Sequence, residues 1–489
     1  MRIRVLSKVV CASLALLFIA PAGASAAPWP PAPHPGTATR TPVGGPAKTA
    51  FALYLPTLPI SLDNASPETD YYENNYLRPD GEGGKFAWAG GFLRDRPAPQ
   101  APVQGPDWQV RNLEKEIQSA RAAGLTGFAL NMFSFSPHGG DKLWRNQELL
   151  MRAAENSGSF SITLVPDMTA AGRSMSVEAL ADATAALAVS PAATRLDDGR
   201  VLVMPFQAES RSPGWWADYL RVMRERHGVP VALVPLFVSE ASALIPSYAP
   251  VSVAASHWGA RNPAHNDPRI EHATAPRQLA SLARSYGLEW VQPVSFQDAR
   301  PTQQVFDEAG NTENLRTTWE LARSTGAVSA LLLTWNDYSE GTHIAPSRKH
   351  GNALLQLTRY YGDEFRTGHR PPLDGDELFL SHRTQFVDDA PSYGHAVMRN
   401  RGGTPPRDTV EALVHLTAPA TVTVRGSGRV ARCELPAGEG VCTMPLTTGS
   451  ISAQIERGGH VSTSVSSPHQ VTQRPYVQDL EYVVVSSRG

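Results

Sequence analysis

Eight short apolar runs recur between residues 51 and 335, and they constrain the fold more than any other feature of the sequence. The runs begin at Phe51, Thr126, Ser161, Arg200, Pro230, Pro250, Glu289 and Val328. Most of them are almost continuously apolar, which is typical of strands that are covered on both faces in a parallel sheet. We therefore interpret each run as a buried parallel strand.

Amphipathic segments lie between these runs. In residues 108–124, Val110, Leu113 and Ile117 recur at the spacing of a helix, and Gly124 follows the last turn. Residues 146–158 and 314–326 repeat the pattern, each with a glycine after the last turn. Eight alternations of strand and helix predict an α/β fold, a (β/α)8 TIM barrel over residues 49–366.

An open doubly wound sheet is the alternative to the barrel. Such a sheet usually carries a glycine-rich phosphate loop after its first strand, and this chain has none there. A long polar loop, residues 57–91, follows the first strand instead. A loop of this length in a compact domain is usually functional or disordered.

The pattern of the chain changes after a proline- and glycine-rich linker. Short runs at residues 409–416, 420–426, 451–459 and 482–487 alternate apolar and polar side chains, and turn signals lie near Gly426 and Gly438. This pattern predicts a small all-β sandwich domain over residues 377–489. The sandwich either takes part in ligand binding or braces the barrel.

The N-terminus has the pattern of an export signal. Three basic residues precede an apolar stretch at residues 9–20, and small residues follow at 24–26. This arrangement predicts a signal peptide, residues 1–26, because the apolar stretch is too short to span a bilayer. Residues 27–48 are rich in Pro, Ala and Gly and predict a disordered leader. We expect a secreted, extracellular protein.

Export of the protein would place its cysteines in an oxidising compartment. Cys11 lies in the predicted signal, so the mature chain keeps Cys433 and Cys442. In an oxidising compartment this pair predicts a disulfide, and its position on either side of a turn suggests a hairpin. Two free thiols are the alternative.

The charge balance argues against a polyanionic partner. The chain has 44 basic and 46 acidic residues, a formal net charge of -2. No global field therefore attracts nucleic acid or anionic lipid, and after the signal no apolar segment is long enough to cross a membrane. We expect no nucleic-acid partner and no membrane partner.

Polar and aromatic residues end the predicted strands. The carboxyl ends of barrel strands form the active site in this fold, so these residues are the candidates for binding and catalysis. They are Tyr54, Asn131, Asp167, Glu209, His257, Trp258, Gln297, Trp335, Asp337, Tyr338, Glu340 and His343. Hydroxyl-binding polar groups beside aromatic rings are typical of a carbohydrate cleft, so we predict a glycan substrate.

Two acids after the eighth run are the candidate catalytic pair. Asp337 and Glu340 supply the two carboxyl groups that glycosidic cleavage requires. Both acids also suit the first turn of a helix as capping residues. The other candidates also have structural explanations. Asp167 can be a structural acid, Glu209 can be a solvated loop acid, and the aromatic residues can serve packing. His and carboxylate residues show no metal-ligand spacing at the strand ends, so we expect no metal and no other cofactor.

The segment TWNDYSEG, residues 334–341, resembles the WNDYGES signature of glycoside hydrolase family 71, the α-1,3-glucanases or mutanases. Residues 51–56, 119–133, 164–168 and 290–296 are similar to other segments of that family in the same order. The resemblance implies an inverting hydrolase with Asp337 and Glu340 as its catalytic pair. It also implies that Asp167 is the third-strand acid and that Asn131 and Tyr54 bind sugar.

The chain departs from this family at two places. Leu53 stands where the family usually has His, and EGTHIAP follows where ESHYI is usual. The second departure resembles the WNEWHEGT motif of family 99-like proteins, which act on α-mannosides and other α-linked glycans.

Our hypothesis is a secreted hydrolase of α-glycans, with α-1,3-glucan as the first choice of substrate. Asp337 acts as general base and Glu340 as general acid in this hypothesis, although the sequence leaves the order open. A hydrolase of α-mannan or another α-glycan is one alternative. A non-catalytic glycan-binding protein on the same barrel is the other.

Overall fold

The computed structural model describes residues 48–137, 140–267, 275–394 and 397–488. The predicted signal peptide and nearly all of the predicted leader lie outside these residues. Residues from Thr41 onward group into one compact unit. No helix among the described residues combines the length and apolar character needed to cross a membrane.

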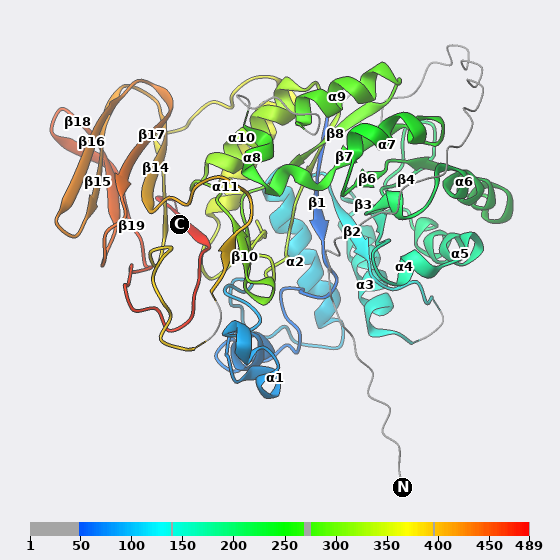
Figure 1. Cartoon of the computed structure of the whole chain (residues 1–489), viewed down its shortest axis with the longest axis horizontal. Helices are drawn as coiled ribbons and strands as arrows, with labels where there is room; N and C mark the ends of the chain where they lie inside the picture. The colour runs from blue at the N-terminus through cyan, green and yellow to red at the C-terminus, as the bar shows by residue number, and fades with distance from the viewer. Residues whose placement is uncertain (1–47, 138–139, 268–274, 395–396, 489) are drawn as a thin grey trace, which may run out of the picture. The chain divides into compact units, whose positions relative to one another are not determined.

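Eight parallel strands close into a barrel (Figure 1). They are β1 (Thr49–Tyr54), β2 (Gly127–Met132), β3 (Ser161–Pro166), β4 (Val201–Val203), the split strand β5 (Val231–Leu233) and β6 (Leu236–Phe237), β7 (Ala254–His257), β8 (Glu289–Val294) and β11 (Ser329–Leu332). The sheet runs in the order β5-β4-β3-β2-β1-β11-β8-β7-β6. Because β5 and β6 are two halves of one strand separated by Val234 and Pro235, the ring is closed and the barrel prediction is confirmed.

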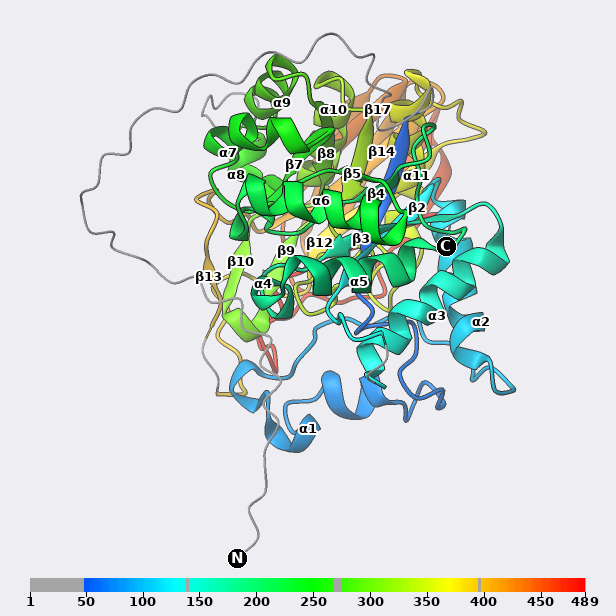
Figure 2. The ribbon, with the colours of Figure 1, turned by 90° about the vertical axis from the view of Figure 1, so that its right-hand side faces the viewer.

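Helices surround the strands. The longer ones are α2 (Trp108–Ala122), α3 (Lys142–Ser157), α5 (Val177–Ala188), α6 (Pro213–His227), α7 (Ala241–Tyr248), α9 (Pro276–Ser285), α10 (Glu313–Ser324) and α11 (Ala353–Thr367). The short ones are α1 (Gly81–Gly84), α4 (Ala171–Ser174), α8 (Pro263–Asn266), η1 (Tyr72–Tyr76), η2 (Ala87–Ala89), η3 (Ala208–Ser210), η4 (Ala249–Val251), η5 (Trp258–Arg261) and η6 (Pro301–Gln303). Helix α5 packs on β3, and α6 packs on β5 (Figure 2).

Local capping explains where these helices begin and end. Ser212 accepts a hydrogen bond from the backbone N–H of Trp215 at the start of α6, and Pro213 occupies the first helical position. Gly228 ends the helix in a left-handed conformation, which costs glycine little because it has no Cβ.

Each strand separates two cores. Phe51, Leu53 and Leu55 face the barrel interior, whereas Ala52 and Tyr54 face the helices. This alternation follows from the two-residue period of a strand. It decides which strand-end residues point into the barrel mouth.

The long loop after β1 extends over residues 55–107, up to the start of α2. Leu58, Tyr72 and Leu93 from this loop pack around Tyr338, which follows the eighth strand. Three short helices, η1, α1 and η2, lie within it. The loop therefore covers part of the segment that carries Asp337 and Glu340.

Two four-stranded antiparallel sheets follow the barrel and confirm the predicted sandwich. The first contains β12 (Glu377–Arg383), β14 (Thr409–Leu416), β17 (Gly438–Pro445) and β20 (Tyr482–Ser486), and the second contains β15 (Ala420–Gly426), β16 (Arg429–Leu435), β18 (Ser452–Arg457) and β19 (His460–Ser466). Alternate side chains of the two sheets, such as Val414 and Val422, form a shared apolar core.

The predicted disulfide joins Cys433 and Cys442, whose Cα atoms are 5.7 Å apart. The expectation that it closes a hairpin is wrong. Cys433 lies on β16 and Cys442 on β17, and these strands belong to different sheets. The turn between them carries the chain from one sheet to the other, so the disulfide ties the two layers of the sandwich together.

A third sheet joins the barrel to the C-terminal region. Strands β9 (Asp298–Arg300) and β10 (Val305–Asp307) follow β8, and β13 (Arg399–Asn400) pairs with β10. The residues of β13 lie between β12 and β14 in the chain. A segment of the C-terminal region therefore completes a sheet that begins at the barrel rim.

Removal of the disulfide should destabilise the sandwich. A Cys433→Ser/Cys442→Ser variant should lose about 2 to 3 kcal/mol of unfolding free energy, because the cross-link restricts the unfolded chain over a short loop. Urea unfolding monitored by circular dichroism measures this loss. A free energy equal to that of the wild type would show that the cross-link does not stabilise the sandwich.

Candidate active site

The barrel mouth is lined by the residues that continue the inward-facing side of each strand. Asn131 lies two residues after inward-facing Ala129, and Asp167 lies two after Val165. Asn131 donates a hydrogen bond to Asp167 at 3.2 Å, so the mouth holds both side chains together. Trp258, after β7, packs its ring against Phe206, with the ring centroids 4.6 Å apart. These residues combine a polar pair with an aromatic surface.

Asp167 is held firmly within this mouth. The backbone N–H and the hydroxyl of Thr169 donate to its Oδ1, and Asn131 donates to its Oδ2. Burial raises the pKa of Asp167 despite these hydrogen bonds. Asn131 Oδ1 is buried and accepts no hydrogen bond from the described residues.

Asp337 follows the eighth strand and is almost wholly buried. Its Oδ1 accepts hydrogen bonds from the backbone N–H and hydroxyl of Ser339, at 3.0 and 2.6 Å, and from the backbone N–H of Glu340 at 3.2 Å. Burial, and then the nearby Glu340 carboxylate, raise the pKa of Asp337 to about 6. A carboxyl group with such a pKa carries a proton in mildly acidic solution.

Glu340 is surrounded by positive charge. Its Oε1 lies 3.0 Å from Nη1 of Arg300, and its Oε2 pairs with Nη1 of Arg261. Two guanidinium groups therefore pair with the two oxygens of the Glu340 side chain. Arg261 also stacks over the ring of Trp258, 4.5 Å from its centroid, which links Glu340 to the aromatic side of the mouth.

Tyr54 and Trp335 are buried against helix α2. The Tyr54 hydroxyl and the Trp335 indole N–H donate to the two carboxylate oxygens of Glu116, at 3.2 and 2.9 Å. The backbone N–H of Ile60 donates to the same carboxylate at 2.9 Å. Both rings belong to the outer core rather than to the barrel interior, which favours a packing role over sugar contact.

Glu116 is itself a buried titratable group. Burial raises the pKa of Glu116 to about 7, and the three donors only partly oppose this shift. Because Trp335 lies two residues before Asp337, Glu116 anchors the segment that carries the candidate acids.

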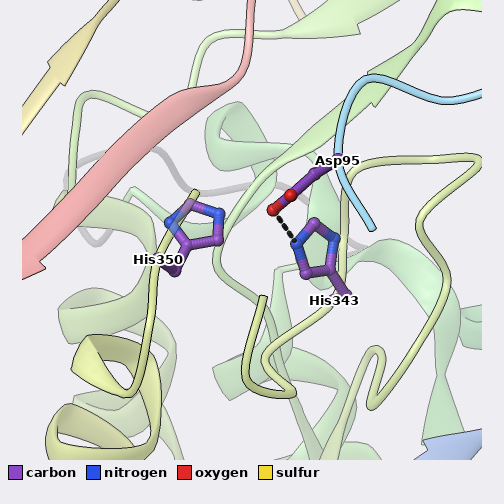
Figure 3. Close-up of side chains that lie close together, drawn as sticks. All are labelled: Asp95, His343 and His350. Carbon is purple, nitrogen blue, oxygen red and sulfur yellow. Dashed lines mark hydrogen bonds and ion pairs between the residues drawn. The ribbon is translucent and has the colours of Figure 1, made fainter. Parts of the chain in front are cut away.

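Tyr338 and His343 are covered by the long first loop. Their ring centroids lie 4.2 Å apart, with the ring planes tilted by 37°. His343 Nε2 lies 3.0 Å from Asp95 Oδ2 (Figure 3). A ring nitrogen of His350 faces the same carboxylate from the other side. Burial opposes ionisation of Asp95, but the hydrogen bond from His343 holds the pKa of Asp95 below its usual range.

The Asp95, His343 and His350 group has the residue types of a metal site. Their ligand atoms lie within 4.8 Å of one another, and all three residues are buried. However, the backbone N–H of Val484 donates to His350 Nδ1 at 3.1 Å. A neutral His350 must then carry its proton on Nε2, the nitrogen that faces Asp95, so this nitrogen has no lone pair for a metal. The group fits a buried polar contact between loops better than a metal centre.

The remaining candidates contact backbone near the rim. Glu209 accepts hydrogen bonds from the backbone N–H groups of Val238 and Ser239, both at 2.9 Å. His257 accepts one from the backbone N–H of Gly259 at 3.2 Å. Gln297 accepts one from the backbone N–H of Tyr482 at 2.8 Å, which ties the seventh strand end to β20. These contacts fix loops around the mouth.

Arg261, Arg300 and Glu116 contact the candidate residues and were not predicted from the sequence. Arginine was not among the residue types expected at the strand ends, and Glu116 lies on a helix. One signal was present: Asp298 and Arg300 stand two residues apart after the seventh strand, so both side chains point to one face.

Comparisons with known proteins agree on a carbohydrate-active family. Residues 104–488 match the family model described as Glycosyl hydrolase family 71. The chain is 25% identical over 389 residues to the glucan endo-1,3-alpha-glucosidase agn1 of Schizosaccharomyces pombe. The aligned region covers 74% of this chain and 88% of that relative.

Solved structures of the GH99 endo-alpha-mannosidase from Bacteroides thetaiotaomicron are also similar. The structure in complex with bis-tris-propane is 15% identical in sequence to this chain, with a TM-score of 0.48. The superposed region covers 65% of this chain and 97% of the mannosidase chain. A second structure of that enzyme is 14% identical in sequence, with a TM-score of 0.47. The superposed region covers 66% of this chain and 98% of the mannosidase chain.

Glu116 should make stability depend on pH. Its folded-state pKa of about 7 lies above its ordinary value of 4.5, so the unfolded chain loses this proton first as pH rises. The stabilisation is therefore complete below about pH 4.5 and is lost as pH rises through about 7, a change on the order of 3 kcal/mol. Between pH 4.5 and 7.5, the unfolding free energy of Glu116→Gln, measured in urea, should decrease less than that of the wild type.

Glu114→Gln, on the same helix but only partly buried, is the control. It should keep the wild-type pH dependence of the unfolding free energy. Equal slopes in the wild type and in Glu116→Gln would contradict the raised pKa of Glu116.

Proposed function

Because the chain belongs to glycosyl hydrolase family 71, we propose that this glycoside hydrolase cleaves α-1,3-glucan with Asp337 and Glu340 as its catalytic pair. The observation that carries the proposal is the electrostatic contrast between these two acids, three residues apart after the eighth strand. The α-1,3-glucan substrate is supported by the similarity to the glucan endo-1,3-alpha-glucosidase of Schizosaccharomyces pombe.

The reaction needs one protonated and one ionised carboxyl group. The protonated acid gives its proton to the glycosidic oxygen as the bond from that oxygen to the anomeric carbon breaks. The carboxylate removes a proton from a water molecule, whose oxygen forms the new bond to the anomeric carbon from the opposite face. We propose this inverting course for the chain, which its family resemblance implies.

The free protein favours Asp337 as the proton donor and Glu340 as the base. Burial raises the pKa of Asp337 to about 6, whereas the Glu340 carboxyl group pairs with the guanidinium groups of Arg261 and Arg300. This order is the reverse of the one in the sequence hypothesis. It follows from the two arginines, whose positions the sequence did not reveal.

Substrate binding is assigned to the residues at the barrel mouth. Asn131 and Asp167 supply hydrogen-bonding groups for sugar hydroxyls, and Trp258 supplies a ring face for stacking. All three residues lie at or after the carboxyl ends of barrel strands, as do the two acids, and this end is where the fold places its active sites.

We further propose that the protein is exported. The predicted signal peptide, residues 1–26, and the disulfide between Cys433 and Cys442 both favour an oxidising compartment. The proposed mature protein then has a leader rich in Pro, Ala and Gly at residues 27–48, a catalytic barrel at residues 49–366 and a β-sandwich at residues 377–489.

Replacement of either acid should strongly lower the rate of hydrolysis. Asp337→Asn and Glu340→Gln should each lower kcat on insoluble α-1,3-glucan by about 10²- to 10⁴-fold, the usual contribution of a positioned acid or base. Reducing-sugar release measures this loss, with dextran, starch and α-mannan tested in parallel. The wild type should act on α-1,3-glucan in preference to the other three.

Asp218→Asn and Glu225→Gln are the matched controls, because both residues are exposed on α6. They should keep wild-type turnover. Wild-type turnover in Asp337→Asn or in Glu340→Gln would refute the assignment of the pair. A clear preference for α-mannan would refute the substrate instead.

The pH profile should distinguish the two orders of acid and base. If Asp337 donates the proton, kcat/KM should fall as pH rises through about 6, because the free enzyme then loses that proton. If Asp337 were the base, kcat/KM would rise over the same range. Initial rates on a soluble α-1,3-linked oligosaccharide between pH 4 and 8 decide between the two outcomes.

A further inference from the structure

A segment of the C-terminal region lies against the rim of the barrel. Between β12 and β14 the chain leaves the sandwich, and β13 pairs in parallel with β10, the second strand of the hairpin that follows β8. The backbone N–H of Arg401 donates to the carbonyl of Phe306 at 2.8 Å. Ala299, Phe306, Met398 and Leu480 form an apolar cluster across this contact.

Arg401 reaches two acids of the hairpin from this segment. Its Nη2 lies 2.5 Å from Asp307 Oδ2, and its Nε donates to Asp307 Oδ1 at 3.2 Å. The same Nη2 lies 3.1 Å from Asp298 Oδ2. Arg401 thus bridges the two carboxylates, while about two fifths of its side chain stays exposed.

Asp298 connects Arg401 to the candidate active site. Its side chain is fully buried and accepts two hydrogen bonds of 2.6 Å from Arg300, one on each oxygen. Arg261 Nε lies 3.4 Å from Asp298 Oδ2. Burial opposes ionisation of Asp298, but these arginines hold the pKa of Asp298 below its usual range. Arg261 and Arg300 are the two residues that pair with Glu340.

Asp298 and Glu340 share two cations. The guanidinium groups of Arg261 and Arg300 pair with both carboxyl groups, and Arg401 supplies a third cation to Asp298. A buried charge is costly unless it is paired, so the loss of one cation must be compensated by the others. Without Arg401, Asp298 depends on Arg261 and Arg300 alone, and competes with Glu340 for them.

We propose that Arg401 is a positioning residue for hydrolysis, which acts through Asp298 on the two arginines that orient Glu340. The proposal rests on the proposed role of Glu340 in catalysis. It gives the C-terminal region a function beyond packing, because a residue outside the barrel completes the charge network of the active site. Arg401 itself contacts neither acid of the catalytic pair.

A purely structural role for Arg401 is the competing explanation. In that case Arg401 only anchors β13 to the hairpin through Asp307, its shortest contact. The two explanations differ in which partner matters. If Arg401 acts through Asp298, loss of Asp307 leaves the essential contact in place.

The test compares kcat and KM of full-length variants on a soluble α-1,3-linked oligosaccharide. Arg401→Ala should lower kcat about tenfold or more, while KM stays within about twofold, because Glu340 is displaced and the binding surface is not. Arg401→Lys should recover part of kcat, since it restores the charge without the planar fork. Guanidinium ion at sub-denaturing concentration should also restore part of kcat to Arg401→Ala through the exposed side of the site.

Two further variants separate the explanations. If Arg401 acts through Asp298, Asp307→Asn should keep kcat near that of the wild type. If Arg401 is only a structural anchor, Asp307→Asn should lower kcat as much as Arg401→Ala does. Arg399→Ala, an exposed arginine on the same strand, should keep kcat and show no response to guanidinium ion.

Three results would overturn the proposal: wild-type kcat in Arg401→Ala, an equal loss of kcat in Asp307→Asn, or rescue absent from both Arg401→Lys and guanidinium ion. Should Arg401→Ala fail to fold, Arg401→Lys and Asp307→Asn still give opposite expectations for the two explanations. Failure of the proposed function has a different signature, because wild-type activity in Glu340→Gln would refute that function whatever Arg401 does.

Discussion

Hydrogen bonding around a closed ring of parallel strands brings the carboxyl ends of all eight strands to one rim. The closure depends on the split fifth strand, in which β5 pairs with β4 and β6 pairs with β7. Segments far apart in sequence, such as those of Asn131, Asp167 and Asp337, meet there as a result. Everything inferred about chemistry rests on this geometric constraint.

Desolvation and charge pairing give the two acids after the eighth strand different surroundings. Asp337 is buried beside another carboxylate, and its pKa rises, whereas Glu340 is held by two arginines. The same balance recurs behind the site, where Asp298 is buried among three guanidinium groups. Buried charges of this kind need compensation from several elements, and Arg401 of the C-terminal region supplies one of the cations here.

Much of the fold was accessible from the sequence, because strand and helix patterns are local. All eight strands of the barrel and the two-sheet character of the C-terminal region were predicted, and the family resemblance was confirmed. The site was less accessible. Tyr54 and Trp335 stand at strand ends as predicted, but both rings turn outward to Glu116. The cysteines bond as predicted, yet they join two sheets.

The sequence by itself determined the periodic pattern of strands and helices, the pair of acids at residues 337 and 340, and the resemblance to a family of glycoside hydrolases. Only the tertiary structure decided which strand-end side chains face the mouth, which cations stand beside each acid, and that Arg401 reaches this network. The physical reason is that backbone preference and hydrophobic period act between near neighbours. Burial and charge compensation, in contrast, depend on contacts between residues that are distant in the chain.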